Sequence, residues 1–111
     1  MASCIFCRLI ADPQFSALYR DDDVVAFADA NPQAPVHFLV VPRQHVERIA
    51  ELDDDHLLGR MFEAAHHVAR DKGVAESGYR LVLNQGPNAG QTVYHVHLHV
   101  LGGRQLNWPP G

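Results

Sequence analysis

Residues 94–101 read Tyr94-His95-Val96-His97-Leu98-His99-Val100-Leu101. Apolar residues alternate with histidines, and strict alternation over this length predicts a β-strand with one buried face. Val96, Leu98 and Val100 would then face the core, and the three histidines would share the other face, each about 7 Å from the next. Imidazole is the side chain whose unperturbed pKa lies closest to neutrality. Such a row therefore favours proton transfer, phosphate chemistry or metal binding.

The composition is that of one globular domain of 111 residues, spanning 1–111. Apolar residues make up 47% of the chain, enough for a core, and the net charge of −4 argues against a nucleic-acid-binding surface. No segment is apolar over the length of a membrane span, and residues 1–4 lack the pattern of a secretory signal. We therefore expect a cytoplasmic protein, with no membrane or nucleic-acid partner, whose two cysteines form no structural disulfide.

The remaining sequence predicts an α+β fold. Apolar residues recur with a period near 3.6 from Asp53 or Asp54 to Lys72, which predicts one main helix that ends at Gly73. His56, His66 and His67 are expected on its solvated side. Short turns between strands favour a largely antiparallel five-stranded sheet with this helix on one face. The predicted strands are 17–20, 24–28, 36–41, 79–83 and 94–101, and a short helical turn is predicted over 4–11.

Two chemical interpretations compete for the histidine row. In one, the His-x-His spacing binds a catalytic zinc ion. In the other, the central histidine attacks phosphorus while its neighbours hydrogen-bond the phosphoryl oxygens. The loop over 84–92 is rich in Gly, Asn and Gln and has no acidic metal ligand, so it suits a phosphate cradle. This loop favours phosphoryl or nucleotidyl transfer over a metal-activated water.

These motifs resemble the histidine-triad (HIT) superfamily. The segment 95–101 matches its triad motif, and the segment 29–42 is similar to its central region. The segments 90–94 and 102–111 resemble the Hint branch, the purine nucleoside phosphoramidases, in particular. The resemblance spans essentially the whole chain and implies a HIT-like fold and a homodimer, in which the C-terminal tail around Trp108 lies near the partner's active site.

The resemblance also implies a reaction and its residues. The substrate would be a purine nucleoside 5′-phosphoramidate, hydrolysed to the nucleoside monophosphate and an amine through a covalent nucleotidyl-histidine, with no metal required for catalysis. His97 would be the nucleophile, and His99 would contact the phosphoryl oxygens. Gln91 and the backbone around Gly90 and Thr92 would help hold the phosphate, and the Thr92 hydroxyl would donate a hydrogen bond near the leaving group. Ala30 replaces the bulkier aliphatic residue common in relatives, so packing against the sugar is expected to be looser. The implied nucleotide pocket comprises Phe6, Phe27, Asp29, His37, Leu39, Asn84, Gly90, Gln91, Thr92, His97 and His99.

The sequence contains a second group of candidate metal ligands, which begins with two cysteines near the N-terminus. Cys4 and Cys7 form a C-x-x-C pair, which by itself is compatible with zinc, redox chemistry or burial. Some HIT proteins hold a structural zinc with two cysteines and two histidines, and His45 and His95 occupy the matching positions here. The resemblance thus implies a structural zinc site, in which the first triad histidine serves the metal and the other two serve catalysis.

Two other functions remain open at this level. One is a nucleotide-binding regulatory or scaffold protein whose hydrolysis is incidental. The other is a nucleotidyltransferase or a dinucleoside polyphosphate hydrolase.

Overall fold

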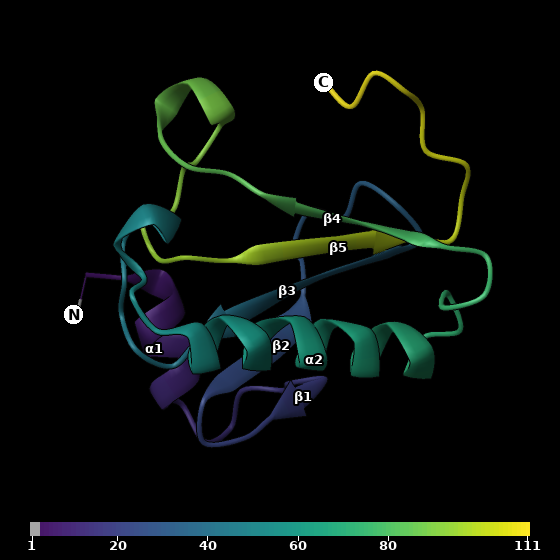
Figure 1. Ribbon diagram of the computed structural model, residues 1–111. Coiled ribbons are helices and arrows are strands. Elements are labelled where there is room, and N and C mark those ends of the chain that lie inside the picture. The colour runs from purple at the N-terminus through teal and green to yellow at the C-terminus, as the bar shows by residue number, and fades with distance from the viewer. Residues whose placement is uncertain (1–2) are drawn as a thin grey trace.

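The computed structural model describes residues 3–111 as a five-stranded antiparallel sheet with a helix on each face (Figure 1). The strand order is β1-β2-β3-β5-β4, which confirms the predicted α+β class and the largely antiparallel sheet. The elements are α1 (Ile5–Ala11), β1 (Tyr19–Arg20), β2 (Val24–Ala28), β3 (Val36–Pro42), the 3-10 helix η1 (Ile49–Glu51), α2 (Asp55–Asp71), β4 (Tyr79–Leu83), the 3-10 helix η2 (Pro87–Ala89) and β5 (Leu98–Gly102).

Helix α2 packs across β2, β3 and β5 and forms the larger part of the core. It begins where the Asp54 carboxylate accepts a hydrogen bond from the Leu57 N–H at 3.0 Å, which satisfies one of the free donors of the first turn. It ends before Gly73, whose φ of +77° a residue with a side chain rarely adopts. The side chains that it buries against the sheet are Leu57, Met61, Ala64, Ala65, Val68 and Ala69.

Helix α1 covers the opposite face of the sheet and brings the N-terminal segment beside the histidines. Phe6 is its buried residue and packs against a second apolar cluster from β2 and β3. Because both faces are covered, β2 and β3 are buried along nearly their whole length. The sequence of β2 is a continuous apolar run, and that of β3 is apolar except for His37. The sheet residues of this second cluster are Val25, Phe27, Leu39 and Val41.

The histidine segment differs from the prediction of a strand over 94–101. Strand β5 starts only at Leu98, so His95 and His97 precede it. Its pairing with β3 ends at Val40 opposite Leu98, because Pro42 has no N–H to continue the ladder. The chain turns there, and the Val96 N–H donates to the Val46 carbonyl instead. The three histidines consequently point to different partners.

Other boundaries differ less. The predicted strand 17–20 is reduced to Tyr19–Arg20, and the 3-10 helices η1 and η2 were not predicted. Phe62 belongs to the apolar pattern of α2 but is 40% exposed, whereas the histidines of this helix are exposed as expected.

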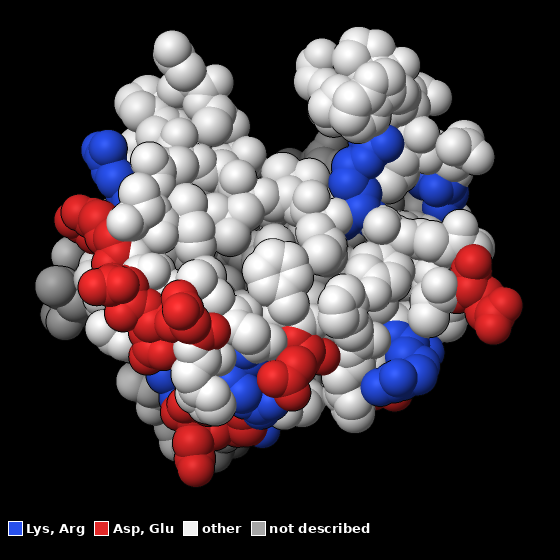
Figure 2. Space-filling model, in the orientation of Figure 1, with Lys and Arg blue, Asp and Glu red and all other residues white. Residues whose placement is uncertain are grey.

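Within residues 3–111, every helix is too short or too polar to cross a bilayer. Acidic side chains gather over the start of α2 and the turn beside it, as Figure 2 shows.

Candidate functional site

A cavity of about 560 Å³ lies between α1, the end of β2 and the histidine segment. This volume is in the range of sites for small organic ligands. The residues that line it are Ile5, Phe6, Leu9, Phe15, Phe27, Ala28, Asp29, Ala30, Leu39, Asn84, Gly90, Thr92, Val93, His97 and His99.

One wall of the cavity is aromatic. The ring centroids of Phe6 and Phe27 lie 5.5 Å apart and those of Phe15 and Phe27 5.3 Å apart, both in edge-to-face geometry. Phe6 also meets the His97 ring edge to face at 5.2 Å. Aromatic side chains pack well against planar ligands, and this wall adjoins a reactive imidazole.

The backbone determines which nitrogen of His97 carries the proton. Its Nδ1 lies 2.8 Å from the His95 carbonyl oxygen, which can only accept, so Nδ1–H donates. In the neutral form of the ring, Nε2 then keeps the lone pair. His97 is buried and lines the cavity, and an unprotonated imidazole nitrogen is the kind of group that can act as a nucleophile.

A second histidine is oriented through a chain of hydrogen bonds that starts at the backbone. The Gln33 N–H donates to His37 Nδ1 at 2.9 Å, so His37 carries its own proton on Nε2. That Nε2–H donates to His99 Nδ1 at 2.9 Å and lies 3.3 Å from an oxygen of Asp29. His99 must then hold its proton on Nε2, where it is available as a donor.

His99 stays neutral at neutral pH. Burial lowers its pKa to about 4, with further lowering by the neighbouring His97 and His37, against which Asp29 acts only in part. A neutral His99 has one N–H to donate, on Nε2.

The group of Asp29, His37 and His99 has the composition of a metal site, since its ligand atoms lie within 4.8 Å of one another. The hydrogen bonds argue against that use. The lone pair of His37 already accepts the Gln33 N–H, and the Nδ1 lone pair of His99 accepts from His37. A metal would have to displace both bonds, so the arrangement fits a hydrogen-bonded relay better.

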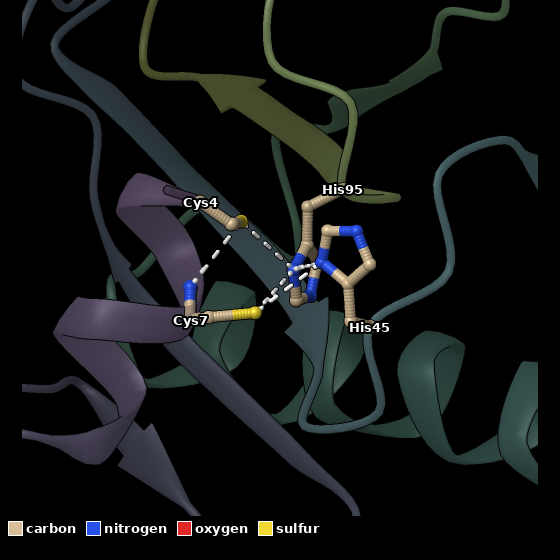
Figure 3. A group of neighbouring side chains, drawn as sticks. All are labelled: Cys4, Cys7, His45 and His95. Carbon is tan, nitrogen blue, oxygen red and sulfur yellow. Dashed lines mark hydrogen bonds between the residues drawn. The ribbon is translucent and has the colours of Figure 1, made fainter. Parts of the chain in front are cut away.

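The cluster of Cys4, Cys7, His45 and His95 is different (Figure 3). His45 Nδ1 and His95 Nδ1 are 3.2 Å apart, Cys4 Sγ is 3.4 Å from His95 Nδ1, and Cys7 Sγ is 3.3 Å from His45 Nδ1. These separations approach the edges of a tetrahedron with Zn–S of about 2.3 Å and Zn–N of about 2.0 Å.

The outer hydrogen bond of this cluster also suits a metal. His95 is fully buried, and its Nε2 lies 2.8 Å from the Pro42 carbonyl, so Nε2–H donates and the Nδ1 lone pair faces the cysteines. Ligating histidines usually have such a partner for their other nitrogen. Burial lowers the pKa of His95, with a smaller raising effect of the bond to Pro42, which favours the neutral form that a metal requires. The donor set therefore fits a four-coordinate zinc.

The buried side chain of Gln91 fixes the polar loop before the histidines through hydrogen bonds to the backbone. Gln91 is buried, its Oε1 accepts the Gly86 N–H at 2.9 Å, and its Nε2 donates to the carbonyls of Glu47 and Val93. Its side chain is not among the residues that line the cavity, because its amide is bonded to the backbone around it, and its part in holding the phosphate stays a prediction. Gly90, at φ of +87°, and Thr92 reach the cavity from the same loop.

The structure brings most of the predicted pocket together. Eight of the implied residues besides the nucleophile line the cavity, namely Phe6, Phe27, Asp29, Leu39, Asn84, Gly90, Thr92 and His99. His37 is not among the lining residues, but it hydrogen-bonds His99, which is. The sequence did not predict Ile5, Leu9, Phe15, Ala28 and Val93 as lining residues. The apolar spacing of Ile5 and Leu9 on a short helix was the one available signal for two of them.

Comparison with known proteins agrees with this geometry. The HIT domain model matches residues 13–106. The chain is 50% identical over 96 residues to an uncharacterised HIT-like protein of Synechococcus elongatus, covering 85% of this chain and 83% of that protein. It is 46% identical over 100 residues to a 14 kDa zinc-binding protein of Zea mays, covering 86% and 77% of the two chains.

Solved structures give the same result. A HIT family hydrolase from Legionella pneumophila superposes with a TM-score of 0.90 at 43% identity, covering 97% of this chain and 99% of the other. One from Clostridium thermocellum superposes with a TM-score of 0.90 at 41% identity, covering 96% of each. The chain belongs to the HIT domain family and is similar to its hydrolases.

Proposed function

We propose that this protein hydrolyses purine nucleoside 5′-phosphoramidates to the nucleoside monophosphate and the free amine, with His97 as the nucleophile. The observation that carries the proposal is the hydrogen bond from His97 Nδ1 to the His95 carbonyl, which leaves the Nε2 lone pair at a cavity of ligand size. The nucleoside would occupy the aromatic wall, with its ribose hydroxyls near Asp29.

The first step replaces the P–N bond of the substrate with a bond from His97 Nε2 to phosphorus. The electron pair of the broken bond stays on the amine, which takes a proton through the Thr92 hydroxyl from solvent. The ring becomes cationic, and the His95 carbonyl stabilises it through the Nδ1–H. His99 donates its Nε2–H to a phosphoryl oxygen as negative charge gathers there.

The second step uses water. Its oxygen bonds to phosphorus while the bond to His97 breaks, and its proton passes to solvent. His97 returns to its neutral form with the same proton on Nδ1, so the site is ready for another substrate. No step requires a metal ion at the phosphate.

We also propose that Cys4, Cys7, His45 and His95 hold a structural zinc. The donor distances and the outer hydrogen bond of His95 support it, and one of the relatives is named a zinc-binding protein. Zinc here would tie α1, and with it the Phe6 wall, to the histidine segment.

A homodimer is a further part of the proposal. Strand β4 is an edge of the sheet, and an unpaired edge strand is prone to pair with another chain. Figure 2 shows a notch above β4, between the η2 loop and the C-terminal tail, that is largely free of charged side chains. Trp108 on that tail is 80% exposed, and a Trp gains most by packing against a partner. Light scattering would measure twice the chain mass if two copies associate.

The direct test is turnover of adenosine and guanosine phosphoramidates by the wild type and by His97→Ala. The variant should lose cleavage while still binding the mononucleotide, because the aromatic wall and Asp29 remain. His56→Ala is the matched control, since His56 is exposed on α2 away from the cavity. Cleavage by His97→Ala at the wild-type rate would contradict the assignment.

A further inference from the structure

A second cavity, of about 410 Å³, adjoins the proposed nucleotide cavity. Ile5, Thr92 and Val93 line both, so the two cavities are neighbours that share α1 and the loop that carries the Thr92 hydroxyl. The remaining residues that line it are Ser3, Cys4, His45, Glu47 and Tyr94.

The position of the second cavity assigns it to one side of the substrate. The nucleoside side of the first cavity is marked by Phe27, Phe15 and Asp29, none of which lines the second. Thr92 is where the proposed function places the proton for the departing amine. A group attached to phosphorus through that amine therefore extends past Thr92 into the second cavity.

Glu47 gives this cavity its charge. Cys4 and His45 face the cysteine and histidine cluster, which leaves Glu47 as the lining carboxylate. Its backbone is fixed, since its carbonyl accepts the Gln91 amide at 2.7 Å. Its side chain is exposed and, within residues 3–111, has no ion-pair partner. The nearest cation in sequence, Arg48, lies over the ring of Tyr94 at 5.4 Å and so borders the same cavity, but it forms no ion pair with Glu47 within residues 3–111.

We propose that this second cavity is the leaving-group subsite, and that Glu47 selects amines whose far end is cationic. The inference rests on the proposed phosphoramidase function and names the class of amine that this site prefers. An aliphatic amine would pass between Ile5 and Val93, and an ammonium at its far end would reach the carboxylate. A carboxylate at the same end would be repelled by it.

The experiment uses three adenosine 5′-phosphoramidates with linear amines of equal length that end in an ammonium, a methyl or a carboxylate. The wild type should give the highest kcat/KM for the ammonium and the lowest for the carboxylate. Glu47→Gln should reduce the ratio of ammonium to methyl by about fivefold, the effect of one exposed ion pair of about 1 kcal/mol. Raised salt should reduce the same ratio in the wild type.

Glu76→Gln is the matched control, because Glu76 is also an exposed glutamate but lies between α2 and β4, outside both cavities. It should leave the ratio unchanged, and Glu47→Lys should reverse the order of the charged amines. Cleavage of all three amides at equal efficiency, or an unchanged ratio in Glu47→Gln, overturns the subsite. Failure to cleave any of the three overturns the phosphoramidase proposal itself, and the subsite with it.

Discussion

Replacement of His37 tests whether the hydrogen-bond chain from the backbone to His99 controls catalysis. His37→Phe keeps a flat buried ring but removes the donor to His99 Nδ1 and the acceptor for the Gln33 N–H, two bonds of 2.9 Å each. His99 could then carry its proton on Nδ1. In that tautomer its Nε2 has no proton to donate to a phosphoryl oxygen. His37→Gln is the matched variant, because the Gln amide nitrogen can occupy the place of His37 Nε2 and donate in its stead.

The size of the effect follows from the lost bond and the unpaired nitrogen. A neutral hydrogen bond contributes about 1 kcal/mol, and a buried group left without a partner costs about 1–3 kcal/mol. With about two thirds of this cost expressed in the transition state, kcat falls by about 10-fold to 100-fold in His37→Phe. The Gln variant should retain most of the rate.

The assay is single-turnover cleavage of one phosphoramidate, combined with the affinity for the mononucleotide and urea denaturation of each variant. The relay predicts a loss in kcat with nearly unchanged binding, and rescue by Gln. Wild-type turnover in His37→Phe would contradict a role of the His37–His99 hydrogen bond in catalysis. So would a Gln variant as slow as the Phe variant at equal stability, because the donor at that place would then have no effect.

The remaining predictions concern the metal and acid stability. Purified protein should contain one zinc per chain, and Cys4→Ala should lose it. Chelation should lower the free energy of unfolding by about 4 kcal/mol when free zinc had stood at about 1,000 times its Kd. A metal-free protein of unchanged stability would rule the site out. Burial alone would raise the pKa of Asp21, but hydrogen bonds from Tyr19 and the backbone, together with Arg60, lower it to about 2. The folded-state pKa is depressed, so its stabilisation is present above the ordinary value near pH 3.8 and is lost as the pH falls towards 2. Asp21→Asn should therefore cost about 1 kcal/mol at pH 6 and almost nothing at pH 2, whereas Asp22→Asn should show no such difference in urea denaturation.

The helices and strands were predicted well where the signals for their ends lie within the segment itself. Strand β4 has the predicted bounds, and α2 begins and ends within two residues of the prediction, because an Asp cap and a Gly stop mark its ends. The histidine strand was predicted too long, since its start depends on Pro42 of the neighbouring strand, which is remote in sequence. Alternation along 94–101 carries no information about that partner.

The same limit applies to the site. The triad motif and the resemblance identified most of the cavity residues. Neither shows that the Gln91 side-chain amide would form its hydrogen bonds with backbone groups around it. The link between His37 and His99 joins residues 62 positions apart, and only the pairing of β3 with β5 brings them together. The assignment of protons to nitrogens likewise needed the positions of backbone groups. Sequence reasoning could name the histidines but not distinguish their protonated atoms.

The proposed mechanism requires a bond between His97 Nε2 and phosphorus. Acid quenching would hydrolyse that bond, so the reaction is stopped by alkaline denaturation within the first turnover and the protein is digested for mass spectrometry. The peptide containing His97 should gain the mass of the nucleoside monophosphate less one water, and fragmentation should place the adduct on His97. An adduct on His99 or His95, or rapid turnover with no adduct at any quench time, would contradict it.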